Sequence, residues 1–306
     1  LHDGRIKALY LVGENPAQTE PNARHVEEGL AKLELLIAQD LFLNDMTARY
    51  AHVVFPASSF AEKDGTFTNT ERRVNRVRAA IPPPGNARVD REIVIDLARA
   101  MGANWPQYPD AESVWNELAD LSPNWYGIRY WRIEETGLQW PCPELDHPGS
   151  PYLHAPAPAR PGGKGKFFPV EFQPPIEEPD EAYPFVLSTG RTLYHYNSAT
   201  MTMREQGILQ KQEDPFFEIS AEDAAALGLA EGDWARLVSR RGELVARARI
   251  TDRVYPGLVW MALHFAQAKV NWLTHDVGDP LIGTPEYKVC AVRVEPLAAA
   301  ARAAAR

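Results

Sequence analysis

The chain has 306 residues, a net charge of −9, 45% hydrophobic residues and 24% charged residues. This length allows two domains, each with a hydrophobic core of its own, and the composition is that of an ordinary globular protein. The acidic balance, without a basic face, argues against a nucleic-acid binder, and the absence of an apolar run of about 18 residues argues against a membrane span. Anionic ligands are still allowed, because local donors can bind phosphate on an acidic protein.

The two cysteines bear on disulfide and redox chemistry, and the start of the chain bears on where in the cell the protein is found. Cys142 and Cys290 form neither a CxxC pair nor a disulfide framework, so each is expected to be a buried apolar residue. The chain starts at Leu1 rather than Met, and no signal-peptide pattern follows. We therefore expect a segment of a longer, cytoplasmic polypeptide.

The first part of the chain alternates strand and helix patterns. The apolar run Ile6–Val12, ended by Gly13, is typical of a buried parallel strand. Further strands are predicted at 33–38 and 52–55, and helices at 22–32, 44–50, 90–101 and 111–121. This β-α-β-α-β order favours a Rossmann-like α/β domain over residues 1–145, with helices on both faces of the sheet.

A proline-rich stretch follows. Residues 141–184 contain 12 of the chain's 26 prolines and the run Gly162-Gly163-Lys164-Gly165. Proline removes backbone donors and glycine adds chain entropy, so residues 146–182 are predicted to be a connector. Its three phenylalanines suggest that part of the connector packs on the domains.

The last part, residues 183–306, is β-rich. Strands are predicted at 184–188, 216–219, 234–239, 244–251 and 258–262. One helix, Ala221–Leu227, starts after Ser220 as its N-cap and ends at Gly228. Short strands separated by glycine turns favour a closed barrel.

The loop Thr189–Thr202 is the most informative polar segment. It places a glycine, a guanidinium, an imidazole and several hydroxyl groups within fourteen residues directly after a predicted strand. Many donors at short range suit a ligand with phosphates and a polar heterocycle. Asn271 and the pair Tyr287-Lys288 add further polar groups near the end of the chain, and together they predict a site for a large anionic organic cofactor.

Several segments, in this order and spacing, carry a family resemblance; they are Gly13-Glu14-Asn15-Pro16, Gln39-Asp40-Leu41-Phe42, 62–69, 189–202, 219–233 and 285–296. With them the chain resembles the C-terminal third of the catalytic subunit of molybdenum- or tungsten-dependent formate dehydrogenases, which are oxidoreductases with a bis-molybdopterin guanine dinucleotide cofactor. The resemblance implies that the last domain is a double-psi barrel. It also implies iron–sulfur clusters held by parts outside this segment.

The resemblance assigns the guanosine of one dinucleotide to Asn15, Thr19, Gln39 and Asp90. Gly13 permits the tight turn before Asn15, at the carboxyl edge of the predicted sheet. Guanine presents two donors on one edge, and a carboxylate such as that of Asp90 can accept both. The competing interpretation of Asp90 is a plain N-cap of its helix.

The remaining site residues lie in the barrel part. Gly190 would let the backbone approach the ligand, and Arg191 can clamp a phosphate or the pterin with two hydrogen bonds. His195 and Asn197 are further donors in the same loop. The resemblance also assigns cofactor contacts to three residues nearer the C-terminus, namely Asn271, Tyr287 and Lys288.

The resemblance implies formate oxidation to CO2, by hydride transfer to the metal centre and onward electron flow. The metal-binding Cys or selenocysteine and the catalytic Arg of such enzymes have no counterpart here, so we expect no catalytic or metal-ligating residue and no activity of the segment alone. Expected partners are the rest of the catalytic subunit and iron–sulfur or flavin subunits, with NAD, a quinone or a ferredoxin as acceptor. The alternatives are a cofactor-free structural subunit of complex I type, another enzyme of this family such as a nitrate reductase, and a stand-alone dinucleotide-binding module.

Overall fold

The computed structural model describes residues 1–106, 108–155, 157–158, 160–212 and 214–297. The chain forms two compact units, of which one contains residues 1–38, 42–53 and 172–306 and the other residues 39–41 and 54–171. The final residues of the expected barrel domain, 298–306, lie outside the described part. No described helix is long and apolar enough to cross a membrane.

The N-terminal part follows the predicted order of elements. It contains β1 (Ala8–Val12), α1 (Pro16–Thr19), α2 (Ala23–Leu30), β2 (Leu35–Asp40), α3 (Asp45–Tyr50) and β3 (Val53–Pro56). The three strands form one sheet in the order β1-β2-β3. A buried cluster of Ala17, Leu30, Leu33, Leu36 and Met46 packs the helices against the strands.

The expectation that the first strand is buried is wrong. β1 is exposed or half-buried along its whole length, because it is the edge strand of a three-stranded sheet. An apolar run identifies a strand, but its burial depends on whether another layer covers it.

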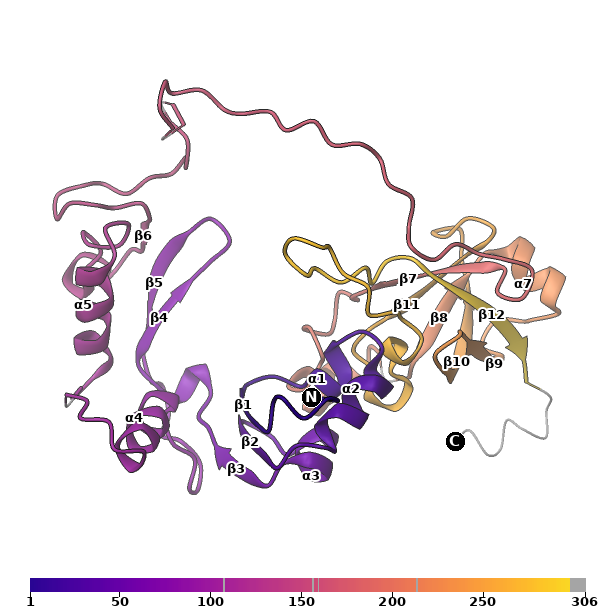
Figure 1. Cartoon of the computed structure of the whole chain (residues 1–306), viewed down its shortest axis with the longest axis horizontal. Helices are drawn as coiled ribbons and strands as arrows, with labels where there is room; N and C mark the ends of the chain where they lie inside the picture. The colour runs from indigo at the N-terminus through magenta and orange to yellow at the C-terminus, as the bar shows by residue number, and fades with distance from the viewer. Residues whose placement is uncertain (107, 156, 159, 213, 298–306) are drawn as a thin grey trace. The chain divides into compact units, whose positions relative to one another are not determined.

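The barrel is closed by six strands, as expected for the last domain (Figure 1). They are β7 (Phe185–Gly190), β8 (Phe216–Ile219), β9 (Trp234–Val238), β10 (Glu243–Ile250), β11 (Leu258–Ala262) and β12 (Cys290–Pro296), in the order β10-β8-β11-β7-β12-β9. Two neighbouring pairs are parallel (β7 with β11, β8 with β10), and the other four pairs are antiparallel. Inward-facing residues such as Leu187, Phe217, Leu237 and Met261 fill the interior.

Short helices surround the barrel. They are η3 (Thr202–Arg204), α6 (Gln206–Leu209), α7 (Ala221–Leu227), η4 (Ala266–Ala268) and η5 (Val270–Trp272). The predicted ends of α7 are confirmed: Ser220 accepts from the backbone N–H of Asp223, and Gly228 has the left-handed φ of 70° that stops the helix.

The second unit combines a small sheet with two helices. Its elements are η1 (Phe60–Glu62), β4 (Gly65–Thr68), β5 (Arg73–Val77), α4 (Asp90–Ala100), α5 (Ala111–Leu121), η2 (Tyr130–Arg132) and β6 (Leu138–Gln139). The antiparallel sheet β4-β5-β6 was not predicted. Both predicted helices are confirmed within one residue, because their apolar positions recur at helical spacing.

Among the described residues, no helix or strand lies between β6 and β7. The start of this stretch still packs, since Cys142 is fully buried and exchanges backbone hydrogen bonds with Asn124 and Gly127. The expectation that the phenylalanines anchor the connector is wrong, because Phe167, Phe168 and Phe172 are 62–98% exposed.

Candidate functional site

The polar loop that follows β7 is held in an unusual backbone conformation. Asn197 and Ala199 both have positive φ angles, 49° and 58°. Asparagine tolerates this region, whereas for alanine it costs about 1–3 kcal/mol, which the surrounding packing must offset. Ala199 is fully buried, so packing fixes the loop in this shape. Strain of this kind, in a loop between packed elements, is characteristic of functional sites.

His195 anchors this loop from inside. Its side chain is 4% exposed, with Nδ1 3.0 Å from Thr202 Oγ1 and Nε2 2.8 Å from the carbonyl of Gln212. Because both ring nitrogens already have protein partners, the geometry gives His195 a role in shaping the loop. Its predicted direct contact with a cofactor stays a prediction.

Arg191 and Asn197, in contrast, are exposed on the outside of the loop. One guanidinium nitrogen of Arg191 donates to Asn197 Oδ1 at 3.2 Å. Within the described part of the chain this is its single hydrogen bond, so most of its five donors face solvent. Arg191 is therefore placed to bind an anion.

Gly190 and Lys288 make close contacts with the protein. A Cβ at Gly190 would lie 2.6 Å from Nε1 of Trp260, so glycine is required here by packing, whatever ligand approaches. Lys288 Nζ donates to the carbonyl of Thr189. Burial, together with the positive charge of Arg191, lowers the pKa of Lys288.

Asn15 carries a buried oxygen without a partner. It follows Gly13, whose φ of 64° makes the predicted turn, and it precedes α1. The side chain is 5% exposed and Oδ1 has no hydrogen-bond partner, while a side-chain hydrogen bond joins Asn15 to Asp45. Since a carboxylate can only accept, the Asn15 NH2 group faces Asp45 and its oxygen is left to accept from a ligand.

A network of hydrogen bonds links α1 to the barrel. Asn271 is 1% exposed, and its amide nitrogen lies 2.9 Å from the carbonyls of both Gln18 and Thr19. The hydroxyl of Tyr287 donates to the same Thr19 carbonyl at 3.2 Å, and Gln18 Nε2 donates to the carbonyl of Ser198 at 3.0 Å. These bonds bring the segment 13–19, the polar loop and the Tyr287-Lys288 pair together within one unit.

Thr19 also bonds within the protein, since its hydroxyl donates to the Asn15 carbonyl at 3.1 Å. Burial, and secondarily the charge of Glu20, raises the pKa of Tyr287. Asn271, Tyr287 and Thr19 thus hold the site together in this structure, and cofactor contacts by them stay predictions.

Lys269, which the sequence did not single out, lies beneath this network. It is 3% exposed, and Nζ contacts Glu27 Oε1 at 2.8 Å and Asp45 Oδ2 at 2.7 Å. Burial alone would lower the pKa of Lys269, but the two carboxylates outweigh it and raise the pKa. Burial alone would raise the pKa of Asp45, but Lys269, the Met46 backbone and Asn15 more than offset it. Lys269 therefore fixes the carboxylate that orients Asn15.

In the second unit, Gln39 and Asp90, which the resemblance assigns to one guanosine, are hydrogen-bonded to each other. Gln39 Nε2 donates to Asp90 Oδ1 at 2.6 Å, and Lys63 Nζ bonds the other carboxylate oxygen. The alternative N-cap role of Asp90 is wrong, because Val89 is the N-cap and Asp90 is the first residue of α4. Their part in binding guanosine stays a prediction.

His264 is a fully buried neighbour of the polar loop. Its Nε2 lies 3.3 Å from Thr192 Oγ1, and its Nδ1 has no partner. Burial, together with the charges of His195 and Arg191, lowers the pKa of His264 to about 4. The imidazole is therefore neutral near pH 7.

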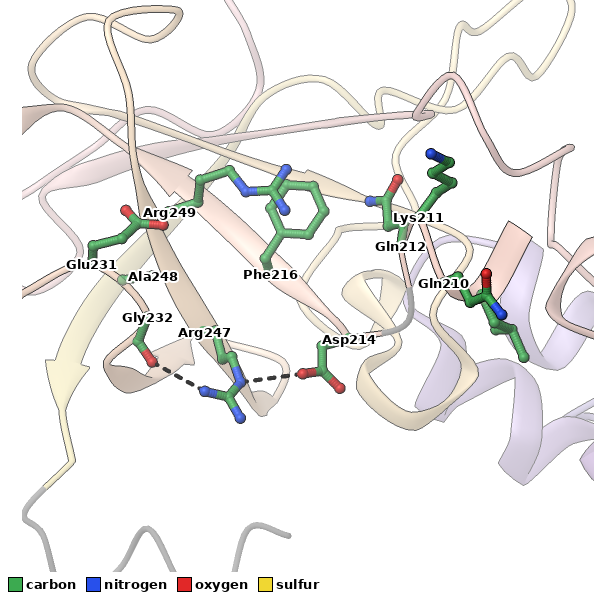
Figure 2. A pocket seen from close by; sticks show the side chains of 11 residues that line it. Gln210, Lys211, Gln212, Asp214, Phe216, Glu231, Gly232, Arg247, Ala248 and Arg249 are labelled. Atoms are coloured by element: carbon green, nitrogen blue, oxygen red, sulfur yellow. Dashed lines mark hydrogen bonds and ion pairs between the residues drawn. The ribbon is translucent and has the colours of Figure 1, made fainter. Parts of the chain in front are cut away.

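A separate pocket of about 330 Å³ lies among residues of β8, β10 and the segments 209–212 and 231–232, together with Asp214, as Figure 2 shows. Arg247 and Arg249 reach it from β10, and Phe216 from β8. Arg247 forms an ion pair with Asp214 at 3.4 Å, and the guanidinium of Arg249 lies 3.5 Å from the ring centroid of Phe216. Neighbouring side chains thus already balance part of the charge of Arg247 and Arg249.

Sequence reasoning missed Gln18, Asp45, Lys63 and Lys269. Gln18 lies between two predicted site residues, which is a usable signal. Lys269 is the only charged residue of the segment Phe265–Leu273, where a buried lysine needs a carboxylate partner. Which carboxylate supplies it follows only from the fold.

Two family models match this chain. Residues 1–100 match the family described as Molybdopterin oxidoreductase, and residues 185–291 match the Molydopterin dinucleotide binding domain. The second match covers most of the barrel, including the polar loop and the first residues of β12.

Curated relatives match almost the whole chain. The "F420-dependent formate dehydrogenase subunit alpha" of Methanocaldococcus jannaschii is 44% identical over 95% of this chain and 43% of its own length. The "Assimilatory nitrate reductase catalytic subunit" of Bacillus subtilis is 37% identical over 97% of this chain and 43% of its own length. The "Formate dehydrogenase H" of Escherichia coli is 34% identical over 96% of this chain and 42% of its own length. The chain thus spans about two fifths of the length of these relatives.

Among solved structures, acetylene hydratase from Pelobacter acetylenicus has the same fold, with a TM-score of 0.74 over 95% of this chain and 44% of that one. The sequence identity is 17%, so the likeness concerns the fold alone.

Proposed function

Because this chain belongs to the molybdopterin oxidoreductase family, we propose that it forms the dinucleotide-binding part of a formate dehydrogenase catalytic subunit. The proposed cofactor is bis-molybdopterin guanine dinucleotide with molybdenum or tungsten. The observation that carries the proposal is the buried, unpartnered oxygen of Asn15, in a unit that also exposes Arg191 on a strained loop. An acceptor and a guanidinium suit a ligand that has both donor groups and phosphates.

The residues present fit this group. Asn15 Oδ1 would accept from a guanine N–H or a ribose hydroxyl, and Arg191 would clamp a phosphate or the pterin. When bound, the cofactor's metal supplies two-electron redox chemistry, so that formate could yield CO2, a proton and two electrons. Asn271, Tyr287 and His195 would keep the two segments and the loop in place, and neutral His264 would add no positive charge beneath the loop.

The acceptor and the partners are part of the proposal. The Methanocaldococcus relative is named as F420-dependent, so F420 joins NAD, a quinone and a ferredoxin as a candidate acceptor. Iron–sulfur or flavin subunits would carry the electrons, and a cytoplasmic location remains proposed. A nitrate reductase is the second candidate, favoured by the 37% identity to the Bacillus subtilis enzyme.

Cofactor release from the full-length catalytic subunit tests the proposal. Acid treatment should liberate about two guanine nucleotides per molybdenum or tungsten atom, and the protein should oxidise formate rather than reduce nitrate. Asn15→Leu should lower the nucleotide content, whereas Arg5→Ala, at an exposed ion pair with Asp3, should leave it unchanged. A protein without guanine nucleotide and metal would instead match the cofactor-free structural alternative.

A further inference from the structure

Three side chains with metal-binding atoms meet on the side of the barrel where β12 starts. They are Glu177, which precedes β7, His275, which follows η5, and Cys290, the first residue of β12. The carboxylate oxygen, the imidazole nitrogen and the thiol sulfur lie within 4.8 Å of one another. They come from three separate segments of the chain, so only the fold brings them together.

The cluster is shielded from solvent. Cys290 is fully buried, His275 is 5% exposed, and the side chain of Glu177 is 11% exposed. Glu286 adds a second carboxylate, with Oε2 3.2 Å from His275 Nε2. The backbone N–H of Val277 donates to His275 Nδ1 at 3.3 Å, and His275 Nε2 lies 3.1 Å from the carbonyl oxygen of Val289, so these bonds fix the ring and an ion has to replace one of them. The orientation of the ring is thus set before any ion arrives.

Thiolate, imidazole and carboxylate together are the ligand types of Zn²⁺. With bonds of about 2.0–2.3 Å, tetrahedral ligand atoms lie about 3.5 Å apart. To bind one ion, the three ligand atoms would have to move about 1 Å closer to one another. Rotation about the side-chain bonds of Glu177 and small shifts of the loops can produce this movement. The cluster therefore needs adjustment but no refolding.

The charges of the surroundings favour a divalent cation. Glu177 forms ion pairs with Arg240 and with Arg241, at 2.6 Å for the latter, and Arg240 also pairs with Asp180. Together with Glu286, the cluster and its surroundings hold three carboxylates (Glu177, Asp180 and Glu286) and two guanidinium groups (Arg240 and Arg241). Their net charge is therefore −1. Adding Zn²⁺ and removing the thiol proton makes the total zero. A carboxylate has about four lone-pair positions, so Glu177 can keep its arginine contacts and still bind an ion.

An approach path exists on the open side of the cluster. A cavity of about 380 Å³ is lined by Glu177, His275, Arg240, Arg241 and neighbouring residues. This volume holds a hydrated ion, so Zn²⁺ could reach the carboxylate and the imidazole before the buried sulfur.

We propose that Glu177, His275 and Cys290 form a structural Zn²⁺ site, with Glu286 or a water molecule as the fourth ligand. Binding exchanges the thiol proton, which passes to water, for a zinc–sulfur bond. The zinc–nitrogen bond replaces one of the two hydrogen bonds of the His275 ring, with Val277 or Val289, and no electrons are transferred. The ion would fasten the segment before β7 and the loop before β12 to the barrel. The site is separate from the polar loop and does not depend on the proposed redox function.

Cobalt titration of the purified chain tests the site, because Co²⁺ takes the same ligands and its thiolate bond absorbs in the near ultraviolet. The wild-type chain should develop this band, and added Zn²⁺ should abolish it. Cys290→Ser should lose the band, whereas Cys142→Ser, at the other buried cysteine, should keep it. Persistence of the band in Cys290→Ser, or its absence from the wild type, would overturn the proposal.

Glu177→Gln and His275→Gln provide a second measurement that does not touch the sulfur. Each should weaken Zn²⁺ binding by more than about 100-fold, since loss of an outer partner alone costs 10–100-fold. Far-UV circular dichroism should show that the folds are intact. Equal Zn²⁺ affinity of folded variants and wild type would contradict the proposal, whatever the cofactor content of the whole enzyme.

Discussion

The contact between α1–α3 and the barrel differs sharply from the polar loop next to it. At the contact, Lys269 and Asn271 are buried and satisfied by neighbouring carboxylates and carbonyls. In the loop, Arg191 is exposed with most of its donors directed to solvent, and Asn15 nearby has a buried oxygen without a partner. Polar residues that look alike in the sequence therefore fall into two groups, those that hold the unit together and those that can bind a ligand.

This difference shows that a polar atom can bind a ligand only if it is not already paired with another group of the protein. A buried polar group without a partner costs about 1–3 kcal/mol, so most such groups are paired within the protein. Substitutions in the first group should reduce stability, and substitutions in the second should reduce ligand binding alone. The following predictions test this division.

The largest effect is expected for Lys269→Met. Removing the ammonium group leaves Glu27 and Asp45 as partly buried carboxylates without compensation, so the free energy of unfolding should fall by about 3–5 kcal/mol. Urea denaturation measures this. Lys7→Met, which breaks an exposed ion pair with Glu34, should cost at most about 1 kcal/mol. Similar losses for both variants would contradict the role given to Lys269.

Acidification should destabilise the chain through His264. Its pKa is about 4 in the folded state and about 6.5 as a free side chain, so between these values the unfolded chain binds more protons. The neutral imidazole therefore contributes its full stabilisation of the folded state above about pH 6.5. As the pH falls to about 4 this stabilisation, at most about 3 kcal/mol, is lost. Urea denaturation at several pH values should show a shallower dependence for His264→Gln. An unchanged slope would argue against a buried neutral imidazole.

Asn271→Ala should cost about 2 kcal/mol, because it leaves the carbonyls of Gln18 and Thr19 without donors. Asn271→Asp should be worse, since it places carboxylate oxygens against carbonyl oxygens. Thermal unfolding of both variants checks this order. If the aspartate variant were as stable as wild type, Asn271 would not donate to α1.

The smallest effect on stability is expected for Arg191→Ala, within about 0.5 kcal/mol, because the side chain is exposed. Guanine nucleotide retention in the full-length subunit should nevertheless fall. Chemical denaturation and nucleotide analysis of the same preparation separate the two effects. A large loss of stability, or full retention, would place Arg191 in the structural group.

Local sequence patterns predicted much of the fold. Helical spacing gave α2, α4 and α5 within a few residues, and Ser220 and Gly228 marked both ends of α7. The antiparallel sheet β4-β5-β6 was missed. Its strands β4 and β5 form a hairpin of only four and five residues, and β6 has two residues and pairs with a strand more than sixty positions earlier. Strand pairing over such a distance leaves no periodic signal in the sequence.

The sequence by itself determined the kinds of chemistry available, namely the polar loop after β7 and the asparagine between β1 and α1, and it indicated the strands and helices that present them. Only the tertiary structure decided which of these groups remain available, because hydrogen bonds such as those of Asn271 to Gln18 and of Tyr287 to Thr19 join residues far apart in the chain. The same holds for Glu177, His275 and Cys290, which become neighbours only when the barrel closes. Local propensity sets the elements, whereas burial and pairing depend on contacts that exist only in the folded chain.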